Sequence, residues 1–214
     1  MNVSNSNASQ RKKINQVNQV NQINHVNQIN QINQINLRFP TEADEETVNA
    51  LDALFAKENF DFSLRHRVAG AAGGVEPWGE YLQRLRDEAR GTNLPEGRVP
   101  AEFLLAEVDG EIVGRVSIRF ALNDYLYRFG GHIGYGVAPR FRRQGHATEI
   151  LRQAIGRVRA RWQQGDIPGA TGDGKILVTC DDENVGSFKT IEACGGVLEN
   201  RVDNDGALVR RYWI

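Results

Sequence analysis

Cysteine and long apolar runs are scarce in this sequence of 214 residues. The two cysteines, Cys180 and Cys194, are too few and too isolated for a disulfide framework or a zinc site. No stretch approaches the roughly 18 consecutive apolar residues that a membrane span requires. The N-terminus is polar and lacks the apolar core of a signal peptide. These absences predict a cytoplasmic protein that holds no metal and does not bind a membrane.

A strong net charge is also missing, since the formal net charge is −1. Arg11, Lys12 and Lys13 give the segment before Leu37 a charge of +3, with no acid to offset it. The remainder therefore has 23 basic residues against 27 acidic residues, a charge of −4. An acidic folded part argues against nucleic-acid binding. The arginines at 140–143 form a local basic patch that suits a small phosphate better than a polymer.

The first 36 residues are distinct in composition from the rest. Residues 14–36 repeat the triplet Ile/Val-Asn-Gln/His, which recurs eight times and ends at Ile35-Asn36. A period of three suits neither a helix, in which each triplet slips by about 60° around the axis, nor a strand, in which every third residue changes face. We therefore expect residues 1–36 to be a disordered Asn/Gln-rich tail. Self-association through the β-prone Ile and Val residues is the alternative.

The folded domain is expected over residues 37–214, where apolar residues make one well-buried core plausible on length alone. Capping residues, glycines and a hairpin signal at Asp109-Gly110 divide it into elements. The predicted order is a strand at 37–39, helices at 41–56 and 77–90, strands at 103–108, 111–122 and 132–138, a helix at 147–162, a strand at 176–180, a helix from 184, and strands at 197–202 and 207–214.

Alternation in the strand at 111–122 predicts which of its side chains share a face. One face is expected to carry Ile112, Val116, Ile118 and Phe120, and the other Val113, Arg115, Ser117 and Arg119.

The stretch 132–160 places a strand, a basic glycine-bearing turn and an amphipathic helix in direct succession. Such an arrangement exposes the first free N–H groups of the helix, at the positive end of its dipole, beside the end of a strand. Gly145 removes the Cβ that would block close approach to these groups. The stretch therefore predicts a site for a phosphate-bearing ligand.

The run 142–147, Arg-Arg-Gln-Gly-His-Ala, resembles the acyl-CoA pyrophosphate signature of the GNAT N-acetyltransferase superfamily, Arg/Gln-x-x-Gly-x-Gly/Ala. Val137-Ala138-Pro139 is similar to the exit of that family's fourth strand, and the predicted order of elements matches the family's order. A P-loop or dinucleotide motif is lacking. The resemblance implies an α+β fold with three layers (α/β/α), in which a mixed, mainly antiparallel sheet of seven strands with four helices is splayed between strands 4 and 5.

The resemblance also implies direct transfer of an acetyl group from acetyl-CoA, as co-substrate, to an amine. Backbone groups of the fourth strand's exit would hold the pantetheine arm, and the N–H groups of residues 143–147 would hold the pyrophosphate. The residues implied in cofactor binding are Val137, Ala138, Arg142, Arg143, Gln144, Gly145, His146, Ala147, Asn184, Ser187 and Lys189.

One position departs from the family's pattern. The family's frequent acid, a tyrosine seven residues after the asparagine that is here Asn184, is replaced by Ile191. Tyr135 and His132 on the central strand are the catalytic candidates in its place, and Tyr125 or Tyr127 are alternatives. Tyr135 is equally consistent with a core aromatic whose hydroxyl is hydrogen-bonded, and His132 with a structural residue.

The resulting hypothesis is an acetyl-CoA-dependent N-acetyltransferase acting on a small-molecule or peptide amine. The acidic balance of the domain favours a cationic amine as acceptor. Because Ile191 replaces the family's frequent acid, a module that binds acyl-CoA without turnover is the alternative. A homodimer, and assembly through the tail, are also left open.

Overall fold

The computed structural model describes residues 35–68, 74–165, 167–168 and 174–214. In these residues, seven strands form one sheet in the order β1-β2-β3-β4-β5-β7-β6. The strands are β1 (Asn36–Arg38), β2 (Ala101–Val108), β3 (Glu111–Arg119), β4 (Ile133–Val137), β5 (Leu177–Asp181), β6 (Val197–Asn204) and β7 (Ala207–Trp213). The α-helices in the same residues are α2 (Glu45–Phe55), α3 (Trp78–Arg90), α4 (His146–Gln164) and α5 (Val185–Ala193).

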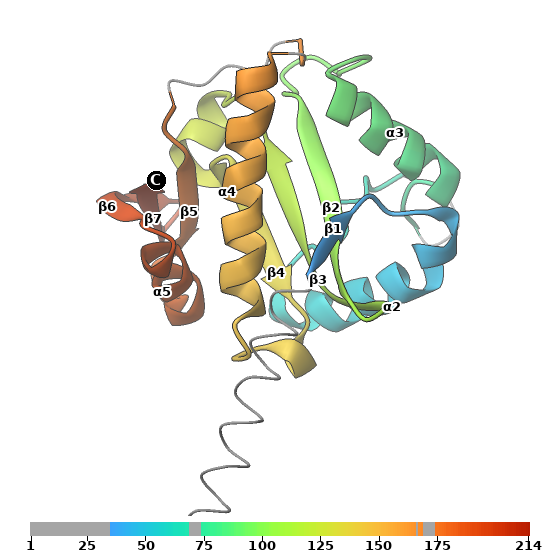
Figure 1. The fold of residues 1–214 in the computed structure, drawn as a ribbon, viewed down its shortest axis with the longest axis horizontal. Coiled ribbons are helices and arrows are strands. Elements are labelled where there is room, and N and C mark those ends of the chain that lie inside the picture. The colour runs from blue at the N-terminus through green and yellow to red at the C-terminus, as the bar shows by residue number, and fades with distance from the viewer. Residues whose placement is uncertain (1–34, 69–73, 166, 169–173) are drawn as a thin grey trace, which may run out of the picture.

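Two hydrophobic clusters, one on each face of the sheet, create three layers (Figure 1). On one face, Leu104 and Ala106 of β2 share a cluster with Ile150 and Leu151 of α4. On the other face, the intervening Leu105 joins a cluster with residues of α2 and α3. Alternate side chains of β2 thus face opposite layers, as a strand buried on both faces requires. The predicted three-layer α+β architecture is confirmed.

Strands β4 and β5 are parallel and stay together only briefly. Ile133 pairs with Val178, while β4 remains paired with β3 as far as Val137 and β5 remains paired with β7 as far as Asp181. All other neighbouring strands are antiparallel. The two parallel strands therefore diverge beyond their first pair, which confirms the predicted splay between the fourth and fifth strands.

Strand β3 differs from its predicted pattern at two positions, Ile112 and Val113. Ile112 packs in the α2/α3 cluster and Val113 packs in the α4 cluster with Val116, so the predicted faces of both residues were wrong. Gly114 pairs with Ala106 and Ile112 pairs with Glu107, which leaves Val113 as an extra residue in β3. An extra residue of this kind, a β-bulge, reverses the alternation on one side of it.

The N-terminal end of the sheet begins slightly before the expected boundary at Leu37. Strand β1 starts at Asn36, and Ile35 is buried in the α4 cluster. The side-chain amide of Gln153 in α4 donates a hydrogen bond to the Ile35 carbonyl, 3.0 Å away. The tail is predicted over residues 1–36, and residues 1–34 of it lie outside the described residues. Among the described helices, none combines the length and apolarity needed to cross a bilayer.

Candidate active site

The turn between β4 and α4 presents a row of backbone donors. Arg143 and Gly145 both have left-handed backbone conformations, with φ of 63° and 89°. In the described structure, no backbone N–H from Arg143 to Ala147 donates to a backbone carbonyl. Successive N–H groups in such a turn, followed by a helix of 19 residues, are an arrangement suited to an anion at the positive end of the helix dipole.

Arg142, the first residue of the signature, is engaged within the protein. Its Nε donates to the Val137 carbonyl at 2.9 Å, and its terminal nitrogens donate to both carboxylate oxygens of Glu58, at 3.0 and 2.7 Å. The hydrogen bonds from Arg142 lower the pKa of Glu58 below its ordinary value. This side chain therefore ties the exit of β4 to the short turn that follows α2.

The other side chains of the turn have different surroundings. Arg143 is exposed and forms no ion pair with a described residue, whereas Gln144 donates to the Arg140 carbonyl at 3.1 Å. His146 is buried against the edge of Phe141, and burial lowers the pKa of its imidazole. A neutral His146 fills the first turn of α4 rather than adding charge. Ala147 packs on the α4 cluster.

The space opened by the splay is bordered by Tyr135 of β4 and the start of α5. The Tyr135 hydroxyl lies 3.0 Å from Ser187 Oγ and 3.2 Å from the Ser187 carbonyl, to which it donates. Asn184 Oδ1 accepts from the Ser187 N–H at 3.0 Å and caps α5. Burial raises the pKa of Tyr135 above its ordinary value and raises that of the Cys180 thiol on β5 to about 11. Both groups are therefore protonated at neutral pH.

The other residues that the sequence singled out do not take part in the hydrogen bonds between Tyr135 and the start of α5. Ile191 is fully buried in the α4 cluster and offers no hydroxyl. Lys189 is exposed on α5 and has no hydrogen bond or ion pair with a described residue. Tyr125 and Tyr127 are exposed on the segment before β4.

His132 joins β4 to β5 beside the Ile133–Val178 pair, where the two strands are still together. Its backbone N–H donates to the Leu177 carbonyl at 2.7 Å, and its ring Nδ1 accepts from the Leu177 N–H at 2.9 Å. The ring lies edge-on to Trp162 of α4, and the residue is 4% exposed. With Nδ1 used as an acceptor by the backbone of β5, His132 fixes where the two strands part.

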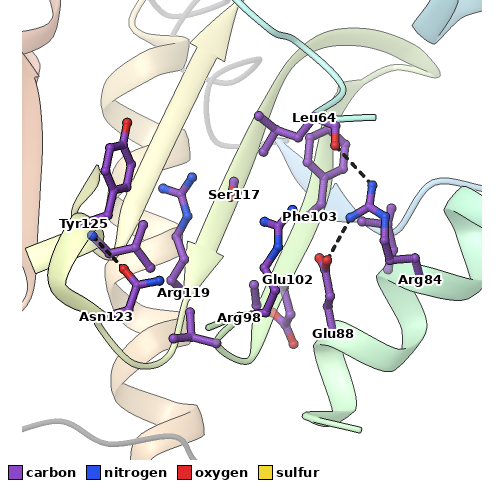
Figure 2. A pocket seen from close by; sticks show the side chains of 14 residues that line it. Leu64, Arg84, Glu88, Arg98, Glu102, Phe103, Ser117, Arg119, Asn123 and Tyr125 are labelled. Atoms are coloured by element: carbon purple, nitrogen blue, oxygen red, sulfur yellow. Dashed lines mark hydrogen bonds and ion pairs between the residues drawn. The ribbon is translucent and has the colours of Figure 1, made fainter. Parts of the chain in front are cut away.

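A pocket of about 230 Å³ opens on the α2/α3 side of the sheet, between α3, β2, β3 and the segment that precedes β4 (Figure 2). Arg119 and Ser117 of β3 line it, with Arg84 and Glu88 of α3 on the opposite wall. Arg115, two residues before Ser117 on β3, is buried, and its guanidinium donates to the carbonyls of Gly134 (3.0 Å) and Asp61 (2.9 Å).

Sequence reasoning placed Arg115, Ser117 and Arg119 on one face of a strand but gave them no functional role. The face that they share was a usable signal, because two arginines on a central strand of a sheet need buried partners or a ligand. In the described part of the chain, no group of three or more His, Cys, Asp or Glu side chains is placed to hold a metal ion.

Comparisons with known proteins agree with this geometry. A family model described as the acetyltransferase (GNAT) family matches residues 50–166, more than half of the chain. No curated protein matches the chain in sequence.

Several solved structures share the fold at low sequence identity. The ribosomal L7/L12 alpha-N-protein acetyltransferase RimL, in complex with coenzyme A, is 17% identical, with a TM-score of 0.55 over 85% of this chain and 93% of that one. RimJ from Mycobacterium smegmatis, in complex with a CoA disulfide, is 23% identical, with a TM-score of 0.55 over 84% and 81%. A spermidine N-acetyltransferase SpeG chimera from Vibrio cholerae and hSSAT is 18% identical, with a TM-score of 0.52 over 85% and 94%.

Proposed function

The chain belongs to the GNAT acetyltransferase family, and on that premise we propose that it transfers an acetyl group from acetyl-CoA directly to a primary amine of a small molecule or peptide. The observation that carries the proposal is the row of unpaired N–H groups from Arg143 to Ala147, placed at the N-terminus of α4 beside the splay. The related structures whose names give an acceptor act on a ribosomal protein or on spermidine, so the acceptor class is open to both small molecules and peptides.

The residues that we propose for cofactor binding surround this point. The N–H groups of residues 143–147 would hold the pyrophosphate, since phosphate oxygens accept from backbone donors at a helix N-terminus. Backbone groups of Val137 and Ala138 would hold the pantetheine arm where β4 leaves β5. Arg142 and Asn184 would support the site indirectly. Arg142 fixes the exit of β4 through its hydrogen bond to Val137, and Asn184 caps α5. Arg143 and Lys189 are exposed and would add positive charge at the rim.

In the reaction, the neutral amine attacks the thioester carbonyl, the C–N bond forms and the C–S bond breaks. A backbone N–H at the splay would stabilise the negative charge on the carbonyl oxygen. The amine gives up a proton to water or base, and the leaving thiolate takes one up. We propose that Tyr135 supplies the latter proton, because its hydroxyl borders the splay and burial keeps it protonated.

Thermal unfolding of the full chain with and without acetyl-CoA tests the cofactor site. Acetyl-CoA at a hundred times its dissociation constant should stabilise the wild type by about 2.7 kcal/mol. Gly145→Glu should abolish this stabilisation, because it places a carboxylate and a strained left-handed residue on the phosphate site. Gly156→Glu is the matched control, since Gly156 is exposed on α4 and a Cβ built on it would have no neighbouring atom within 4 Å outside the helix's own backbone.

Equal stabilisation of both variants by acetyl-CoA would remove the phosphate site from this turn. Release of free thiol in the presence of an amine then separates a transferase from a module that binds acyl-CoA without turnover.

A further inference from the structure

The pocket on the α2/α3 side contains positive charge that no carboxylate neutralises. Arg119 makes a single hydrogen bond, from Nη1 to the Gly130 carbonyl at 3.5 Å, and no ion pair with a described residue. Arg98 contacts the Nε2 atom of His66 at 2.7 Å, and burial lowers the pKa of this imidazole, so that it stays neutral. Figure 2 shows the guanidinium groups of Arg119 and Arg98 directed into the pocket.

The acidic residues that line the same pocket are already paired. Glu88 accepts from Arg84 at 2.8 Å, and Arg84 also binds Glu76 at 2.6 Å. Glu102 is 2% exposed and forms its ion pairs with Arg157 and Arg161. The residues that line the pocket thus include three arginines, Arg84, Arg98 and Arg119, against two glutamates, and neither Arg98 nor Arg119 forms an ion pair with a described residue.

A serine hydroxyl also lines the pocket. Ser117 is 4% exposed as a residue, and its hydroxyl forms no hydrogen bond with any described residue. Ser117 and Arg119 are two positions apart on β3, so both project from the same face of the sheet. Together they offer a hydroxyl and a guanidinium to one ligand.

We propose that this pocket binds an anionic group of the acceptor, and that the acceptor is a small amino acid or a similar amine with a carboxylate. Arg119 would hold the carboxylate through its planar pair of donors, with Ser117 as a further donor and Arg98 at the rim. The proposal rests on the proposed function, since it concerns the acceptor of the same transfer reaction.

The position of Arg119 fits an acceptor of this size. A Cβ built on Gly134 of β4 would lie 3.2 Å from Arg119 Nη1, so this guanidinium rests directly on the strand that leaves β5. Gly134 directly follows Ile133, the residue of β4 that pairs with β5, so it lies where the splay begins. A carboxylate at Arg119 would therefore place an amine a few bonds away beside the start of the splay. The pocket volume of about 230 Å³ also falls below that of pockets for drug-sized ligands.

This inference replaces the cationic amine expected from the overall charge. A domain charge of −4 acts at long range and is screened within about 8 to 10 Å in salt. The charges of Arg119 and Arg98 act at contact distance inside a pocket, where screening is weaker.

Acceptor specificity of the full chain tests the proposal. With acetyl-CoA fixed, thiol release is measured for the α-amino acids, β-alanine and 2-aminoethylphosphonate, each against the amide or ester that lacks the charge, and for 1,4-diaminobutane. We expect kcat/KM to favour the charged member of at least one pair by tenfold or more. Aminoethylphosphonate separates a preference for carboxylate from one for any anion.

Variants then assign the preference to the pocket. Arg119→Gln should lower kcat/KM for the preferred acid on the order of 10- to 100-fold, the range for loss of a charged hydrogen bond. It should leave the KM for acetyl-CoA and the rate with the uncharged partner unchanged, and Arg119→Lys should recover part of the loss. Arg86→Gln, an exposed arginine on α3 outside the pocket, is the control.

Each failure has its own signature. Absence of stabilisation by acetyl-CoA would contradict the proposed function. Intact stabilisation by acetyl-CoA with equal or better use of amides, or of the diamine, would overturn the anionic acceptor alone. If no amine in the panel is acetylated, the amino acids are added to the complex with CoA in thermal unfolding. The proposal would then be overturned if no amino acid stabilises the wild type, or if Arg119→Gln is stabilised as much as the wild type.

Discussion

Tyr135 is the residue that we propose as the proton donor at the splay. The position that carries the family's frequent tyrosine is the buried Ile191, so a proton donor has to come from another element. Tyr135 lies on β4, and its hydroxyl reaches Ser187 at the start of α5, the helix that also carries Ile191. A hydroxyl on β4 can thus occupy the same region between the strands as one on α5.

Tyr135→Phe is therefore expected to lower kcat by roughly 100-fold, near the lower end of the range for general acid–base catalysis. The KM for acetyl-CoA should change little, because Phe retains the packing of the ring against the core. Steady-state kinetics with thiol detection gives both values.

Tyr127→Phe is the comparison variant, since its side chain is exposed on the segment before β4 and does not line the acceptor pocket. A wild-type kcat for Tyr135→Phe, or an equal loss in Tyr127→Phe, would remove Tyr135 from the reaction. Retained stability of Tyr135→Phe in thermal unfolding separates a catalytic loss from a folding defect.

At the scale of elements, the turn between β4 and α4 follows from local sequence. A strand, Pro139, Gly145 and an apolar helical repeat occur within one stretch, so the turn and helix could be predicted without tertiary information. The splay itself depends on pairing between strands that are about 45 residues apart, Ile133 with Val178. Only the resemblance to a family predicted it.

Other elements could not be read from the sequence because they depend on how strands pair. The bulge at Val113 reverses the face of Ile112. Because Ile112 and Val113 are both apolar, the sequence alone does not indicate the bulge. Arg119 lies in a charged pocket because α3 and β2 place paired carboxylates around it, which no local pattern records. The structural role of His132 arises from Leu177 on another strand.

The short 3₁₀ turn at Glu42–Asp44 joins β1 to α2 through one carboxylate. Both terminal nitrogens of Arg38 donate to Asp44 at 2.8 Å, and the Thr41 N–H and hydroxyl donate to the same carboxylate at 2.7 and 2.8 Å. These hydrogen bonds, with that from Arg38 the largest, lower the pKa of Asp44 from 3.8 to about 2. The side chain is 8% exposed, so the interactions are sheltered from solvent.

Because the pKa of Asp44 is lower in the folded than in the unfolded chain, its stabilisation is complete above pH 3.8 and is lost as the pH falls toward 2. Asp44→Asn should reduce the free energy of unfolding at pH 7 by roughly 2 kcal/mol. The difference from wild type should shrink between pH 4 and pH 2. Denaturant titrations across this range measure it, and a gap that stays constant with pH would contradict the assignment.

At the scale of the whole molecule, the two proposed binding regions lie on opposite sides of the sheet. The row of N–H groups at the start of α4 belongs to the side covered by α4 and α5, while the pocket of Arg119 lies on the side of α2 and α3 (Figures 1 and 2). Between β4 and β5 the described sheet has only the pair Ile133 with Val178, so beyond that pair the two strands are not joined by ladder hydrogen bonds. A donor held on one side and an acceptor held on the other would meet there, which suits direct transfer without a covalent enzyme intermediate.

The boundary between tail and domain falls within the triplet repeat, and this gives a matched test of the domain organisation. Ile32 and Ile35 are successive isoleucines of the repeat, each followed by Asn, and Ile35 is 6% exposed in the α4 cluster. We propose that residues 1–34 are the disordered tail that the repeat predicts, with the catalytic domain starting at Ile35. Ile35→Ala should then lower the free energy of unfolding by about 2 kcal/mol or more.

Ile32→Ala should leave the unfolding free energy unchanged, because a side chain in a disordered tail buries no surface. Denaturant titration of the two variants beside the wild type gives the comparison, and light scattering of the full chain and of residues 35–214 reports on assembly. Equal destabilisation by both substitutions would extend the folded domain into the repeat. A drop in particle mass beyond that of the missing residues would instead assign the repeat a role in self-association, the alternative that its Ile and Val residues keep open.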